Sequence, residues 1–114
     1  MLLVQQITSK PLQKQTLVLD DGTSVVIELY YRPNQMGWYF NEISRNDFIL
    51  RGVRVTNSPN ILHQFKNQIP FGLGCFSIEN KEPTSIEDFS SGTSKLYILT
   101  ALEVLMYSEY LASG

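Results

Sequence analysis

The stretch QTLVLDDGTSVVIELYYR, residues 15–32, contains the strongest structural signal in the chain. Apolar residues alternate with other residues on both sides of the Asp-Asp-Gly at residues 20–22, which is the pattern of two strands joined by a tight turn. Asp and Gly are typical turn residues because Asp bonds nearby backbone and Gly reaches the left-handed conformation. The stretch therefore predicts a β-hairpin.

Two registers of this hairpin compete. A two-residue turn would put the two leucines of the first strand on the opposite face from the apolar residues of the second. A three-residue loop at residues 20–22, with its glycine in the left-handed conformation, pairs Leu17 with Val25 and Leu19 with Thr23. One face is then uniformly apolar, so we expect this second register.

Further strands follow the hairpin. After a turn, the aromatic run at residues 38–43 is expected to complete a three-strand meander, and residues 48–55 are expected to form the next strand. Gly52 interrupts the alternation there and indicates a bulge or close packing, while Arg51 and Arg54 are expected to point outward. The remaining strands are predicted at residues 1–4, 73–78 and 95–99, with a polar, turn-rich stretch at residues 80–92.

The chain ends in a predicted helix, at residues 101–111. Thr100 can serve as the N-cap with Glu103 as the third helical residue, and Leu99 and Val104 lie where a hydrophobic staple forms. Ser108 and Glu109 are expected to be wetter. The apolar stripe expected to pack on the sheet consists of Leu102, Leu105, Met106 and Tyr110.

These elements predict a mainly β fold. We expect a small antiparallel β-barrel or sandwich of six to seven short strands with a C-terminal α-helix. A length of 114 residues is that of one domain with its own core, so a single domain over residues 1–114 is expected.

Composition excludes several classes of function. The chain is 43% hydrophobic and 18% charged, which is typical of globular proteins. A net charge of −2, with acids and bases mixed, provides no field for attracting nucleic acid, so nucleic acid binding is not expected. No apolar run approaches the roughly 20 residues of a membrane span, and the apolar start is too short for a signal peptide. One cysteine and one histidine encode neither a disulfide nor a zinc site, and no cofactor is expected.

Cys75 and His63 are nevertheless a conceivable thiolate–imidazole pair, with Asn60 or Asn67 to orient the imidazole. We favour the interpretation that Cys75 is a small buried strand residue. The nearby Gly-Leu-Gly at residues 72–74 resembles the start of a dinucleotide fingerprint, but no third glycine follows. Close packing of a strand is therefore the expected role of these glycines.

Residues 57–76, NSPNILHQFKNQIPFGLGCF, combine two prolines, two close glycines and a row of amides with apolar residues. Pro59 and Pro70 prevent this stretch from forming one helix. Uncharged amides are suited to a fixed contact with another backbone.

We interpret residues 57–71 as a docking element, with Phe65 and Phe71 as apolar anchors and Asn67 and Gln68 bonding partner backbone. The alternative is that the apolar residues close one end of the chain's own core and the amides satisfy loop backbone. In that case the interface is expected on the aromatic meander, around Tyr30, Trp38 and Tyr39.

Motifs along nearly the whole chain carry a family resemblance. They are PLQKQTLVLDDGT (11–23), LYYRP (29–33) with GW (37–38), GVRV (52–55), SPNIL (58–62), NQIPFGL (67–73), EPT (82–84), EDFSSG (87–92) and KLYILT (95–100). Together they resemble the baseplate plug family of tailed bacteriophages.

The resemblance implies a non-enzymatic virion component that lies in the tail baseplate and helps to close the tail channel. Its implied partners are hub, spike, tube or neighbouring plug subunits, in an oligomeric assembly made from chains synthesised in the host cytoplasm. The alternatives are a small β-barrel binding module of cellular origin and a cysteine hydrolase that uses Cys75 and His63.

Overall fold

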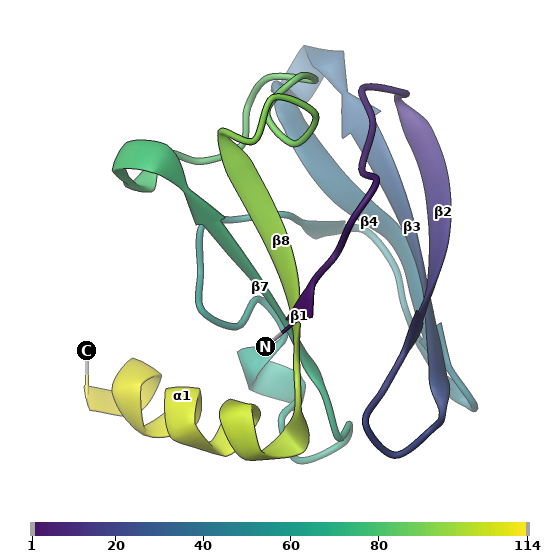
Figure 1. Cartoon of the computed structure of the whole chain (residues 1–114), viewed down its shortest axis with the longest axis vertical. Helices are drawn as coiled ribbons and strands as arrows, with labels where there is room; N and C mark the ends of the chain where they lie inside the picture. The colour runs from purple at the N-terminus through teal and green to yellow at the C-terminus, as the bar shows by residue number, and fades with distance from the viewer. Residues whose placement is uncertain (1, 114) are drawn as a thin grey trace.

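A computed structural model describes residues 2–113, with side chains as far as residue 107 (Figure 1). The described chain consists mainly of strands and ends in one helix. The strands are β1 (Leu2–Leu3), β2 (Leu12–Val18), β3 (Ser24–Arg32), β4 (Gly37–Arg45), β5 (Phe48–Leu50), β6 (Val53–Arg54), β7 (Gly72–Ser77) and β8 (Ser94–Leu99). The helix α1 spans Ala101–Ser113, and short 3-10 turns lie at Pro33–Gln35, His63–Phe65 and Ile78–Asn80.

The strands form two antiparallel sheets that lie across from one another in Figure 1. One sheet has the order β2-β3-β4-β5, with β6 also on β4, and the other has the order β1-β8-β7. No strand pairing joins the two sheets within residues 2–113, so the described strands do not close into a barrel. The expected mainly β fold with a C-terminal helix is confirmed. Residues 2–113 contain eight strands instead of six or seven, because the strand expected at residues 48–55 is divided into β5 and β6.

The hairpin of β2 and β3 adopts the register of the three-residue loop. Leu17 is opposite Val25, and the N–H of Leu19 donates to the carbonyl of Thr23 over 2.8 Å. Gly22 has a φ of +86°, in the left-handed region that only glycine reaches at little cost. The apolar residues of the hairpin share one face, as expected: Leu19, Val25, Ile27 and Leu29 are buried, and Leu17 is half-buried.

β4 contains a bulge that was not predicted from the sequence. Glu28 of β3 is opposite Glu42, whereas the next residue, Leu29, is opposite Phe40, so no residue of β3 is opposite Asn41 in the strand pairing. The extra residue changes the side-chain alternation by one position. Phe40 and Ile43, three residues apart, therefore both point into the core.

Gly52 separates β5 from β6 because it has a φ of +73°. A Cβ at this position would meet nothing within 4 Å, so close packing does not explain the glycine. Its left-handed backbone conformation does. Arg51 points outward, as expected, and forms an exposed ion pair of 3.0 Å with Glu42. Arg54 is half-buried over the ring of Tyr39, at 5.5 Å from its centroid.

The core lies between the two sheets. Trp38 is fully buried and meets Tyr31 and Phe89 edge-on, with ring centroids 5.4 and 5.8 Å away. Its indole N–H donates to the carbonyl of Ser85 over 3.2 Å, which ties the loop at residues 81–93 to the core. The largest fully buried side chains are Trp38, Phe40, Phe71, Ile27, Leu29, Ile43, Leu62, Leu73, Leu96, Leu99, Val25 and Val55.

The start of α1 follows the predicted capping box. The backbone N–H of Glu103 donates to Oγ1 of Thr100 over 3.2 Å, and the N–H of Thr100 donates to Oε1 of Glu103 over 3.0 Å. Leu99 and Val104 are both buried, as a hydrophobic staple requires. No helix among the described residues is long and apolar enough to span a membrane.

The prediction that the apolar stripe of α1 packs on the sheet is wrong for the side chains that the structure describes. Leu102, Leu105 and Met106 are 67%, 65% and 63% exposed. Figure 1 shows why: α1 leaves the end of β8 and extends away from the five-stranded sheet. The expectations for Tyr110, Ser108 and Glu109 concern side chains outside the described part.

Candidate protein interface

The predicted docking element, residues 57–71, is attached to β7 by backbone hydrogen bonds. Ser58 and Cys75 form an antiparallel bridge, with N–H groups that donate to each other's carbonyls over 3.0 and 2.9 Å. The N–H of Ile61 donates to the carbonyl of Leu73 over 2.7 Å. The first part of the element is therefore internal architecture.

The two glycines of β7 allow this close approach. A Cβ on Gly72 would lie 2.6 Å from Oδ1 of Asn60, and a Cβ on Gly74 would lie 2.6 Å from the backbone carbonyl oxygen of Pro59. Real Cβ atoms do not come so near other heavy atoms. The expectation of close strand packing is confirmed for both glycines.

Two of the amides in the element satisfy the chain's own backbone. Asn60 is buried, and its Oδ1 accepts from the N–H groups of Leu62 and Leu73 over 3.0 and 3.3 Å. Oδ1 of Asn57 accepts from the N–H of Ser77 over 2.9 Å. These contacts match the alternative in which amides hold the loop.

The four predicted interface residues have different environments. Phe71 is 0% exposed and belongs to the core in this structure. Phe65 is half-buried and meets Phe48 edge-on at 5.9 Å. Asn67 and Gln68 are exposed at the end of the 3-10 turn. The structure therefore leaves both amides accessible, leaves Phe65 partly accessible and buries Phe71.

The aromatic meander offers less exposed surface than its composition indicates. Trp38 is core, and Tyr30 is 38% exposed. Tyr39 is half-buried, with the guanidinium groups of Arg32 and Arg54 at 4.2 and 5.5 Å from its ring centroid. Cation–π contacts of this kind occupy the ring faces that a partner would otherwise use.

The environments of Cys75 and His63 argue against thiol chemistry. Cys75 lies within β7 and is fully buried, and this burial raises the pKa of its thiol to about 11. A protonated thiol without solvent access is a poor nucleophile. His63 begins the 3-10 turn of the docking element.

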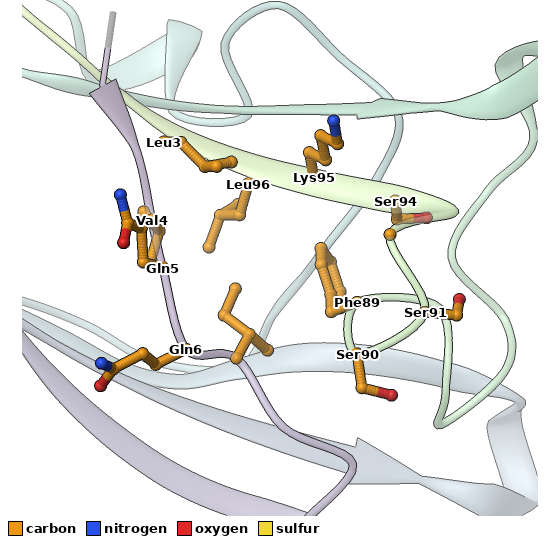
Figure 2. A pocket seen from close by; sticks show the side chains of 12 residues that line it. Leu3, Val4, Gln5, Gln6, Phe89, Ser90, Ser91, Ser94, Lys95 and Leu96 are labelled. Carbon is orange, nitrogen blue, oxygen red and sulfur yellow. The ribbon is translucent and has the colours of Figure 1, made fainter.

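A hollow of about 450 Å³ lies beside the end of β1 and residues 89–96 (Figure 2). The polar ends of Gln6, Ser91 and Lys95 point away from one another in Figure 2, so these groups do not converge on a ligand. The described side chains, which end at residue 107, also include no group of three or more His, Cys, Asp or Glu residues placed to hold a metal ion.

Two exposed features were not recognised in the sequence as surfaces. One is the apolar stripe of α1, which the helical spacing reveals without indicating what covers it. The other is the free edge of β2, which depends on strand order and has no sequence signal of its own. The described members of the stripe are Leu102, Leu105 and Met106.

Comparison with known proteins identifies the family. The profile of the family described as cyanophage baseplate Pam3 plug gp18 matches residues 4–101. The match includes β2 to β8 and the docking element, and it ends at the first residue of α1. No curated protein matches the chain. Because the family profile matches most of its length, the chain belongs to the phage baseplate plug family.

Proposed function

We propose that this protein plugs or closes the channel at the tip of a phage tail through contacts with hub and spike subunits. The observation that carries the proposal is the match to the baseplate plug family over residues 4–101. Family membership makes the chain a structural component of the phage tail baseplate, with other baseplate proteins as partners. The closing of the channel and the identity of the contacting subunits are the proposal.

The exposed amides of the docking element support a contact there. Asn67 and Gln68 follow the 3-10 turn, where Gln68 and Ile69 both donate backbone N–H groups to the carbonyl of Phe65 over 2.9 and 3.3 Å. This compact turn presents the two amides on a preorganised backbone, which lowers the entropic cost of binding. In our proposal they bond partner backbone and the exposed part of Phe65 packs beside them, while Phe71 supports the turn from the core.

The apolar stripe of α1 supports burial of a second surface in the baseplate. Leu102, Leu105 and Met106 have the spacing of one helical face and are about two-thirds exposed. Contiguous exposed apolar side chains are typical of surfaces that another protein covers.

We also propose that residues 1–114 act as one domain, which is made in the host cytoplasm and assembled into the baseplate in several copies.

A double substitution tests the proposed contact. Asn67→Ala with Gln68→Ala should leave the purified chain folded, because both side chains are exposed. Loss of hydrogen bonds worth about 1 kcal/mol each should lower incorporation into tail baseplates roughly tenfold or more. Incorporation is measured by quantitative mass spectrometry of purified tails.

The chain contains a matched control. Asn34 and Gln35 are also an exposed Asn-Gln pair on a 3-10 turn, on a different loop. The variant with Asn34→Ala and Gln35→Ala should be incorporated like the unmodified chain. Equal incorporation of the two double variants would exclude the contact at residues 67–68, and absence of the unmodified chain from purified tails would exclude the function.

A further inference from the structure

β2 has an edge that none of the described strands covers. The N–H of Leu19 donates to the carbonyl of Thr23, and the N–H of Tyr31 donates to the carbonyl of Pro11. In an antiparallel ladder, hydrogen-bonded pairs alternate with pairs whose peptide groups point away from the partner strand. Odd-numbered residues of β2 therefore bond β3. The residues whose N–H and C=O groups point away from β3 are Leu12, Lys14, Thr16 and Val18.

These outward peptide groups have no further backbone hydrogen bond among the described residues. The segment that follows β1 reaches β2 through side chains of β2. Nε2 of Gln15 donates to the carbonyl of Gln5 over 2.9 Å, and the side-chain amide of Gln13 bonds backbone groups of Thr8 and Lys10. β2 is thus a terminal strand of its sheet, as Figure 1 shows. Unpaired edges of this kind are templates for strand pairing.

A groove follows this edge. Three hollows lie along β2. The first, of about 410 Å³, is lined by residues 13–16, and the second, of about 400 Å³, by residues 15–18. The third, of about 130 Å³, is lined by residues 18–20. Neighbouring hollows share lining residues: Thr16 belongs to the first two, and Val18 and Ile98 belong to the last two. The three hollows therefore adjoin one another as a groove along β2, bounded on the opposite side by residues 2–6, by Thr8 and Lys10, and by residues 98–100.

We propose that this groove accepts an extended segment of another baseplate protein, which adds to β2 as a further strand. The free N–H and C=O groups of β2 match the backbone of an extended peptide. Residues 2–6 line the opposite side of the middle hollow, and Leu2 with residues 98–100 lines the opposite side of the smallest one, which favours a single extended segment over a complete second sheet.

The exposed side chains of β2 define the chemistry of that segment. Leu12 and Val18, at the two ends of the strand, are 55% and 64% exposed. Lys14 lies between them and has no ion pair among the described residues. Cross-strand neighbours interact most favourably when they are apolar pairs or opposite charges. The added strand should therefore carry apolar residues near its ends and an acidic residue opposite Lys14.

This surface differs from the docking element. The inference rests on the proposed function in one respect: it assumes that the partner is another protein of the same baseplate. The variant at residues 67–68 and the tests below can therefore fail independently.

Amide hydrogen exchange tests the added strand directly. Exchange is read at single residues in the isolated chain and in assembled baseplates. We expect the amides of Lys14, Thr16 and Val18 to slow roughly tenfold or more on assembly, while those of Gln15 and Leu17 are protected in both states. Unchanged rates at the even-numbered residues would overturn the inference. Protection that grows with the concentration of the isolated chain would also overturn it, because the occupant would then be a second copy.

A substitution of one backbone donor gives a second test. Thr16→Pro removes an N–H that β3 does not use, and proline is tolerated on strand edges when its missing donor would face outward. Thr16→Val keeps this N–H and the branched shape of the side chain. We expect Thr16→Pro to fold but to be incorporated roughly tenfold less than Thr16→Val. Equal incorporation of the two folded variants would overturn the inference, and if Thr16→Pro fails to fold, the exchange rates decide.

Discussion

Gly72 and Gly74 show how a missing side chain positions a loop. Their hydrogen atoms leave room for Asn60 and for the carbonyl of Pro59, so the loop lies directly on β7. Sequence spacing was sufficient to predict close packing at this Gly-x-Gly, but the partner atoms come from residues 12 to 15 positions earlier. Only the folded chain reveals them.

Replacing Gly74 by Ala should destabilise the protein by about 1 to 3 kcal/mol, because the new Cβ would lie 2.6 Å from a backbone oxygen that cannot easily move. Gly37→Ala is the control, since its Cβ would meet the guanidinium of Arg54 at 2.7 Å, and the end of a long side chain can shift more easily than backbone. Denaturant unfolding of both variants measures the difference. Equal losses of stability in the two variants would mean that the backbone at Pro59 shifts as easily as the side chain of Arg54.

The turn of the first hairpin contains a pH-sensitive contact. The hydroxyl and the backbone N–H of Thr23 donate to Oδ1 of Asp21 over 2.6 and 2.9 Å, and with Arg45 nearby they lower the pKa of Asp21 below its usual 3.8. A lowered pKa stabilises the folded state above the unfolded-state pKa, and this contribution is lost as the pH falls through the folded-state pKa.

Asp21→Asn should therefore remove part of the acid sensitivity. The variant keeps an oxygen acceptor but cannot titrate, so the difference in melting temperature between it and the unmodified chain should be constant at about pH 5 to 7 and should shrink below about pH 4. Thermal unfolding across this range provides the measurement. A difference that does not change with pH would show that the charge of Asp21 is unimportant.

At the scale of elements, local patterns predicted those features that depend on neighbours in sequence. The hairpin register followed from alternation around Gly22, and the helix start followed from Thr100 and Glu103. The bulge at Asn41 was missed, although Phe40 and Ile43 are spaced three apart, which strict alternation does not allow for two core residues. That spacing is the signal that could have revealed it.

The capping box should control the stability of α1 itself. Thr100→Ala removes the acceptor for the N–H of Glu103 and should cost the helix about 1 kcal/mol, whereas Thr100→Ser keeps it. Because the described stripe of α1 is exposed, the loss should appear as faster amide exchange in the helix, with little change in the melting of the sheets. Unchanged exchange in Thr100→Ala would mean that other contacts hold the helix start.

At the scale of the whole molecule, sequence could not distinguish a core from an interface. Phe71 was predicted to contact a partner and is buried in its own chain, whereas Leu102 and Leu105 were predicted to be buried and are exposed. Apolar side chains need cover, but nothing in their spacing says which chain provides it. Strand order and the direction of α1 decide this, and both depend on long-range contacts.

In our proposal, this plug-family protein closes the channel at the tail tip. A cryo-electron reconstruction of the intact tail of the phage that encodes the chain tests it most directly. We expect density for the two-sheet domain on or around the tail axis at the tip, in contact with hub and spike and blocking the channel. A tip with an open channel, or with this domain only at the periphery of the baseplate, would contradict the claim.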